Sequence, residues 1–189
     1  RQPGSSLKPF LYAMAFDRGI TAASVLADIS TTYQTANGPY HPRNYDRRYH
    51  GPVRAREALA SSYNVPAVGI AERIGYATLL HGLHHAGFGS LTRSAEHYGL
   101  GLALGNGDVT LIELANGYRT LANGGAWSPV RYWASEGGAA APDSAPRQVV
   151  SRASAAIALD ILSDPVARIP GFGLSTPFDW PFRAAAWPP

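Results

Sequence analysis

The 189-residue sequence contains no cysteine, one methionine and few charged residues, which make up 15% of the chain. The lack of cysteine excludes disulfides and thiol chemistry. No run of about 18 apolar residues is present, so no membrane-spanning helix is predicted. The net charge of +3 is small, and the arginines are scattered. We therefore expect one globular domain that does not bind nucleic acid.

Lysine is almost absent as well. The chain has 16 lysine and arginine residues together, and only Lys8 is a lysine. A buried amine can lose its proton, whereas a guanidinium effectively cannot, so a single lysine suggests a chemical role. Ser5 lies three residues earlier, on the same face of a helix. This S-x-x-K spacing pairs a hydroxyl nucleophile with a base. The pattern is short, however, and also occurs by chance.

The residues around this pair predict a helix that ends at Gly19. We expect Ser5 or Ser6 to cap it, and Pro9 lies in the first turn, where a missing N–H matters least. Leu7, Phe10, Leu11 and Met14 then recur at helical spacing.

A second polar group is expected between two further helices. The first is predicted over Pro52–Ala60, and the second runs from Val65-Pro66 to Gly75, each with an early proline. Ser62 and Asn64 would then lie at the corner between them, with short polar side chains that can point into a cleft. The alternative is an ordinary capping corner before Pro66.

A helix over Tyr76–His85 carries three histidines, His81, His84 and His85. Their spacing could hold zinc, but no acidic residue accompanies them. We interpret them as a solvated helix face and expect no metal or cofactor.

The remaining pattern predicts a loop from Ala27 to Tyr49 and close backbone packing in the glycine-rich residues 98–107. Thr110 and Glu113 form a capping box before a helix. Further expected elements are a strand over Trp127–Trp133, a strand at Val149-Val150, a helix that begins after Ser151 and ends at Asp164-Pro165, and a strand beginning in residues 182–187.

Three longer segments resemble the transpeptidase domain of penicillin-binding proteins, and they span nearly the whole chain. They are R-Q-P-G-S-S-L-K-P-F at the start, P-R-N-Y-D-R-R-Y-H-G-P-V from Pro42, which is similar to the 1C type of class A, and G-L-A-L-G-N-G-D-V-T-L-I-E-L-A-N-G-Y-R-T-L-A-N-G-G from Gly101. The resemblance implies an α+β, β-lactamase-like fold, with a helical cluster beside an antiparallel sheet.

The resemblance also implies roles for the two motifs, S-x-x-K and S-x-N. Ser5 would be the acylated nucleophile and Lys8 its base. Ser62 would relay protons to the leaving amine, and Asn64 would hold Lys8 and a backbone amide of the peptide. The implied reaction is D,D-transpeptidation of peptidoglycan stem peptides ending in D-Ala-D-Ala, and β-lactams would acylate the same serine. The full protein would lie in the bacterial periplasm at the inner membrane, with a glycosyltransferase domain before Arg1.

The third motif of the family, K-T-G, is absent, since the chain has no second lysine. We therefore expect residues 1–189 to be a partial domain that ends before the K-T-G strand, with an incomplete sheet and little activity alone. One alternative is a non-catalytic or inert fragment. Another is a D,D-carboxypeptidase or β-lactamase, which Tyr63 disfavours because many β-lactamases have Asp there.

Overall fold

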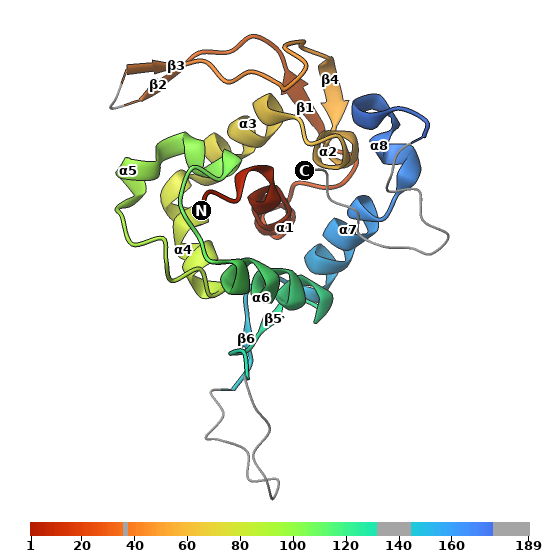
Figure 1. Ribbon diagram of the computed structural model, residues 1–189. Helices are drawn as coiled ribbons and strands as arrows, with labels where there is room; N and C mark the ends of the chain where they lie inside the picture. Colours follow the sequence, from red (N-terminus) through yellow and green to blue (C-terminus); the bar gives the residue numbers. More distant parts are fainter. Residues whose placement is uncertain (36–37, 132–144, 176–189) are drawn as a thin grey trace, which may run out of the picture.

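The structure is a computed structural model that describes residues 1–35, 38–131 and 145–175. Helices form most of it and surround one central helix, α1 (Figure 1). The helices are η1 (Gly4–Leu7), α1 (Lys8–Phe16), α2 (Ala55–Ala60), α3 (Asn64–Ile74), α4 (Tyr76–His85), α5 (Ala95–Tyr98), η2 (Gly99–Leu104), α6 (Leu111–Ala122), α7 (Arg152–Leu162) and α8 (Pro165–Phe172). The strands are β1 (Val25–Asp28), β2 (Tyr33–Thr35), β3 (Gly38–Tyr40), β4 (Gly51–Arg54), β5 (Ala126–Trp127) and β6 (Arg147–Gln148).

Helix α1 is the core of the molecule. All nine of its residues are buried, from Lys8 to Phe16. Apart from Lys8 they are apolar or aromatic on every face, and a helix of that kind must be covered on all sides. The Phe10 ring packs edge-on against Phe88, with 5.2 Å between ring centroids, and against Tyr118, at 5.4 Å. The sequence thus carries its one lysine into the centre of the fold.

The strands form three separate antiparallel pairs in the described part of the chain. Strands β1 and β4 pair from Val25 with Arg54 to Asp28 with Gly51. Strands β2 and β3 form a hairpin, and β5 pairs with β6. The loop predicted over Ala27–Tyr49 is therefore wrong in part, because these residues include β2, β3 and the end of β1. The mixture of helices and small sheets is α+β, as predicted.

The first residues are fixed by partners more than 100 positions away. Arg1 and Val109 exchange backbone hydrogen bonds of 3.0 and 3.1 Å, and the Tyr118 hydroxyl donates to the Ser6 carbonyl at 3.0 Å. Gly105 has a φ of +71°, and a β-carbon there would lie 2.2 Å from the Gly4 oxygen. Only glycine allows this contact, which confirms the predicted close backbone packing in residues 98–107.

Several helices follow the predictions, and α4 matches Tyr76–His85 exactly. The capping box of Thr110 and Glu113 opens α6, and Ser151 caps α7 through a hydrogen bond from the Ser154 N–H. The expected serine cap at the first helix is wrong: Pro3 and Leu7 occupy the cap positions and accept no side-chain bond. The helix starts as a 3-10 turn instead.

Three other predictions need correction. Pro52 lies in β4, and α2 begins only at Ala55, because β1 pairs with the preceding residues. The strand predicted over Trp127–Trp133 shares only Trp127 with β5, and the strand predicted at Val149-Val150 is wrong, because β6 covers Arg147–Gln148. Residues 132, 133 and 182–187 lie outside the described residues.

Helix α8 was not predicted. The sequence predicts that a helix ends at Asp164-Pro165, yet this pair also begins the next helix. The Asp164 carboxylate accepts hydrogen bonds from the N–H groups of Val166, at 2.9 Å, and Ala167, at 3.2 Å. An acidic cap followed by proline is a helix-start pattern, so the signal was present in the sequence.

Candidate active site

The four predicted site residues come from two places in the fold. Ser5 lies in η1 and Lys8 begins α1, while Ser62 and Asn64 lie at the corner between α2 and α3. Ser5, Ser62 and Asn64 line one cleft of about 450 Å³. The other residues lining it are Asn44, Tyr45, Asp46, Ser61, Tyr63, Gly171 and Phe172. Two motifs 57 positions apart in the chain therefore meet at one cleft, since Ser5 and Ser62 share its wall.

Lys8 connects the two motifs. Its side-chain nitrogen lies 3.0 Å from Ser62 Oγ and 2.7 Å from Asn64 Oδ1, and it also contacts the Ser62 carbonyl oxygen. The residue is completely buried. Every partner is neutral, so no carboxylate among these contacts stabilises the ammonium form.

This environment changes the protonation of the amine. Burial lowers the pKa of Lys8 from 10.5 to about 7. A protonated amine has three donors and no acceptor, but the neutral amine has a lone pair that can take a proton from a hydroxyl. An amine with a pKa near neutrality is half in this form at physiological pH and matches the requirement for a general base.

No hydrogen bond in the described part of the chain joins Ser5 Oγ to Lys8 Nζ. Instead, the lysine contacts the S-x-N corner, and Ser5 shares the cleft. Long or missing catalytic hydrogen bonds are common in ligand-free sites and shorten when substrate binds. The geometry therefore places two hydroxyls and an amide around one cavity, with the buried Lys8 amine hydrogen-bonded to the second hydroxyl and to the amide.

The buried amine predicts an unusual pH dependence of stability. Between pH 7 and 10.5 the unfolded chain holds the Lys8 proton and the folded chain does not, so the free energy of unfolding rises with pH. Relative to Lys8→Met, we expect a slope of about 1.4 kcal/mol per pH unit in this window. Urea unfolding of both proteins at several pH values measures the slope. Equal slopes would mean that Lys8 keeps an ordinary pKa in the folded state.

The backbone at the corner has an uncommon conformation. Ser62 has a φ of +56°, a left-handed value that is rare for residues other than glycine. Such a conformation costs about 1–3 kcal/mol and persists only where the surroundings fix it. Here the Ser62 carbonyl and hydroxyl both turn towards Lys8, so the unusual φ accompanies the contact between the two motifs.

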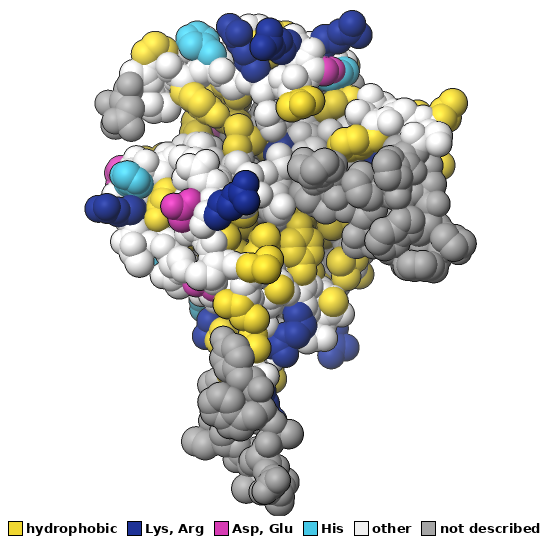
Figure 2. Space-filling model, viewed as in Figure 1, with side chains coloured by type: hydrophobic (Ala, Val, Ile, Leu, Met, Phe, Trp, Pro, Cys, Tyr) yellow, Lys and Arg dark blue, Asp and Glu magenta, His cyan; other side chains and the backbone are white. Residues whose placement is uncertain are grey.

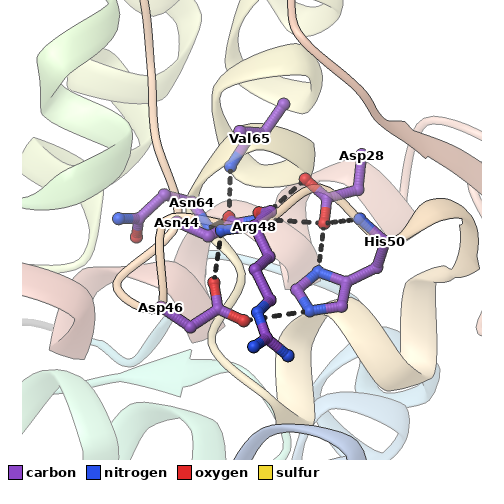
Figure 3. Close-up of polar contacts among 7 residues, drawn as sticks. All are labelled: Asp28, Asn44, Asp46, Arg48, His50, Asn64 and Val65. Carbon is purple, nitrogen blue, oxygen red and sulfur yellow. Dashed lines mark hydrogen bonds and ion pairs between the residues drawn. The ribbon is translucent and has the colours of Figure 1, made fainter.

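A second group of polar residues supports this corner, and the sequence reasoning missed its role. Asp28, Asn44 and His50 form a hydrogen-bonded cluster behind Asn64 (Figure 3). Asn44 and His50 lie within the segment P-R-N-Y-D-R-R-Y-H-G-P-V, which carried the family resemblance. No local spacing links them to Asp28, because β1 and the 42–53 segment meet only in the folded chain.

The histidines of α4 do not converge. His84 Nε2 bonds the Leu91 carbonyl at 2.8 Å, while His81 and His85 lie with their ring centroids 5.6 Å apart. Within the described residues, no group of three or more potential metal ligands gathers. No helix in the same residues is long and apolar enough to cross a bilayer.

A larger hollow of about 800 Å³ lies elsewhere, between the β2–β3 hairpin and η2, and is visible beside the hairpin in Figure 2. Tyr33, Tyr40, Glu72 and Tyr98 are among its lining residues, and none of the four predicted site residues is. Size alone would therefore select a different cavity. We place the candidate site at the smaller cleft because Ser5, Ser62 and Asn64 line it, and the buried Lys8 amine is hydrogen-bonded to Ser62 and Asn64.

Comparison with known proteins shows the family of the chain. The family model described as the penicillin binding protein transpeptidase domain matches residues 1–172. Penicillin-binding protein 1A of Neisseria flavescens is 38% identical over 128 residues, covering 66% of this chain and 16% of the relative. Penicillin-binding protein 1A of Escherichia coli K12 is 39% identical over 127 residues, covering 66% and 15%. The matched part is thus only about a sixth of these relatives' length.

Solved structures share the fold. Penicillin-binding protein 1A of Haemophilus influenzae superimposes with a TM-score of 0.68 at 26% identity, covering 95% of this chain and 31% of that one. A peptidoglycan glycosyltransferase of Burkholderia ambifaria gives a TM-score of 0.70 at 18% identity, covering 86% and 55%. The relatives named 1A are consistent with class A, while the 1C type stays a prediction. With its family model matched over most of its length, the chain belongs to the penicillin-binding protein transpeptidase family.

Proposed function

We propose that this chain carries the acyl-serine site of a D,D-transpeptidase that cross-links peptidoglycan. The observation that carries the proposal is the buried Lys8 amine, with a pKa of about 7, held by Ser62 and Asn64 beside the cleft that Ser5 lines. A serine at its free pKa is a weak nucleophile and needs such a base. The family membership supports the same chemistry.

In the proposed reaction, Ser5 Oγ attacks the carbonyl carbon of the penultimate D-Ala and passes its proton to Lys8. The peptide C–N bond then breaks, and Ser62 hands the proton on to the leaving amine of the terminal D-Ala. Asn64 orients Lys8 through its side-chain oxygen. The resulting ester of Ser5 is attacked by an amine on a neighbouring stem peptide, which forms the cross-link and frees the serine. A β-lactam would enter at the first step and stay as the ester.

The wider context is part of the same proposal. Stem peptides and β-lactams are the proposed ligands, no metal or cofactor takes part, and the site of action is the periplasmic face of the inner membrane. We propose that residues 1–189 form a partial transpeptidase domain and that membrane anchoring and a glycosyltransferase domain belong to a longer protein.

A non-catalytic role is the second candidate, because the sequence has no Lys-Thr-Gly. That motif would supply a cation and hydroxyl for the substrate carboxylate, and its strand one oxyanion donor, which alone contributes about 100- to 1000-fold in rate. A carboxypeptidase or β-lactamase is less favoured, since Tyr63 stands in the S-x-N motif.

Mass spectrometry of a penicillin adduct tests the proposal. We expect the 189-residue chain to gain the mass of one penicillin slowly, and peptide mapping to place it on Ser5. A form extended through a Lys-Thr-Gly segment should react faster. Ser5→Ala should gain nothing, with Ser6→Ala as the matched control that still reacts. An unmodified protein in every form would favour the non-catalytic role.

A further inference from the structure

A buried carboxyl group lies at the centre of the cluster behind the active-site corner. Asp28, at the end of β1, is completely buried. Asn44 Nδ2 donates to both of its oxygens at 2.8 Å. The His50 N–H donates to Oδ2 at 3.0 Å, and His50 Nδ1 lies 2.6 Å from the same oxygen. No arginine or lysine pairs with Asp28 among these contacts, so its interactions are directed at two residues of the 42–53 segment.

The first of these residues reaches the start of α3. Asn44 Oδ1 accepts from the backbone N–H groups of Asn64, at 2.8 Å, and Val65, at 3.2 Å. The cap residue of α3 itself, Tyr63, makes no side-chain cap hydrogen bond. Asn44 therefore supplies from a distant loop the cap that this helix lacks locally. It also fixes the backbone of the residue whose side chain holds Lys8.

The second residue reaches the middle of the same corner. The His50 ring stacks on Tyr63 with 4.1 Å between centroids and an angle of 11°. Its Nε2 lies 3.1 Å from Asp46 Oδ2, so Asp28 and Asp46 both face this histidine. Both ring nitrogens of His50 contact carboxylates, which fixes the ring. Tyr63 stacks on this ring and is therefore fixed as well. The two residues that follow the left-handed Ser62 are thus each fixed by a partner of Asp28. Figure 3 shows the branch from Asp28 through Asn44 to Asn64.

We propose that Asp28 is a positioning residue for the acyl-transfer site, which acts through Asn44 and His50 to hold the Ser62–Tyr63–Asn64 corner against Lys8. The role in acyl transfer rests on the proposed function, whereas the contacts from Asp28 to the corner do not depend on it. Left-handed backbone at a serine needs surroundings that determine it, and these two branches from one carboxyl group provide them.

The single lysine makes the proposal directly measurable. Protein labelled with [ε-¹³C]lysine gives one side-chain signal for the chain, whose pH titration reports Lys8 alone. In Asp28→Asn, the corner loosens and water reaches the amine. Because water also accepts hydrogen bonds, the dominant change is rehydration of the ammonium, and we expect the midpoint to rise by about one pH unit or more. Loss of the negative charge of Asp28 alone would instead lower the midpoint of the Lys8 titration. An unchanged or lowered midpoint would overturn the proposal.

Asp17→Asn is the matched control. Asp17 likewise accepts hydrogen bonds at the start of a helix, from the Ser151 N–H at 2.9 Å and the Ser154 hydroxyl at 2.6 Å, but it lies at the other end of α1. We expect it to lower the thermal midpoint and to leave the Lys8 titration unchanged. A matching Lys8 shift in both variants would indicate general loosening and overturn the assignment to Asp28.

A double variant that exchanges Asp28 and Asn44 tests the proposal even if Asp28→Asn alone does not fold. In the double variant Asp28→Asn with Asn44→Asp, an amide again faces a carboxylate, and the new carboxylate still caps α3. The Arg48 carbonyl, which Asn44 now contacts at 2.8 Å, loses its donor, so recovery should be partial. We expect the double variant to fold and to titrate closer to the unsubstituted chain than Asn44→Asp alone. No recovery would contradict the pairing.

These outcomes separate the inference from the proposed function. A Lys8 midpoint near 7 that is insensitive to Asp28 would remove the positioning role and leave the base assignment intact. A midpoint near the ordinary 10.5 in the unsubstituted chain would contradict the base assignment itself.

Discussion

Lys8→Arg is expected to abolish acylation of Ser5, lowering the rate by at least about 1000-fold. The substitution keeps the positive charge and a long side chain but removes the ability to accept a proton near neutral pH. Lys8 Nζ now contacts Ser62 Oγ at 3.0 Å and Asn64 Oδ1 at 2.7 Å. A guanidinium there could donate to the same oxygens, yet it could not take the proton of the serine.

The measurement is labelling by a fluorescent penicillin over time, on the longest form of the protein that contains residues 1–189. Arg18→Lys is a suitable control, because Arg18 bonds the Met14 carbonyl near the far end of α1, away from the cleft. Lys8→Met, which fills the space without charge, separates loss of the base from crowding by the larger arginine. Labelling of Lys8→Arg at the unsubstituted rate would show that Lys8 is not the base.

Asn64→Asp is expected to move the acylation profile to higher pH by about 1–3 units. A carboxylate in place of the amide oxygen, 2.7 Å from Lys8 Nζ, would stabilise the ammonium and raise the pKa of Lys8 from about 7. Because acylation needs the free amine, its rate rises with pH through that pKa. At pH 7, where half of the unsubstituted Lys8 is already protonated, the rate should therefore fall by about 5- to 500-fold and recover in alkaline solution.

Asn64→Ala distinguishes this electrostatic effect from simple loss of contacts. It removes the bond to Lys8 and the 2.8 Å bond to the Arg43 carbonyl without adding charge. We expect a slower reaction whose pH midpoint moves less than that of Asn64→Asp. If the acylation profiles of both variants move by the same amount along the pH axis, the shift comes from the lost Asn64 contacts. The added negative charge would then not be its cause, and the proposed charge mechanism would be wrong.

The sequence was sufficient for the two motifs because each is local. The S-x-x-K spacing and the short polar residues between two predicted helices single out Ser5, Lys8, Ser62 and Asn64 as candidates, and the longer family-like segments favour this reading over chance spacing and an ordinary capping corner. The apolar run after Lys8 also predicts a helix, and its lack of a polar face explains why α1 is central. The family resemblance added the roles, which none of these local signals contains.

Features that depend on contacts between distant segments were not predictable in this way. Asp28 looked like part of a loop, since its partners Asn44 and His50 are 16 and 22 positions away. Pro52 suited the start of a helix, but pairing with β1 places it in a strand. Helix α8 is a different case, because its Asp164-Pro165 start was local and was interpreted only as a stop.

The close contact of Gly4 with Gly105 has a consequence for the order in which the protein acquires its site. Together with Arg1–Val109 and Ser6–Tyr118, it closes loops of more than 100 residues around the first segment of the chain. Contacts of such long range form late, because the entropy of loop closure must be overcome first. Ser5 is among the first of these residues to be synthesised, yet it cannot be held in place until α6 has been made. We therefore expect the serine to remain unreactive towards penicillin in nascent chains that end before Tyr118.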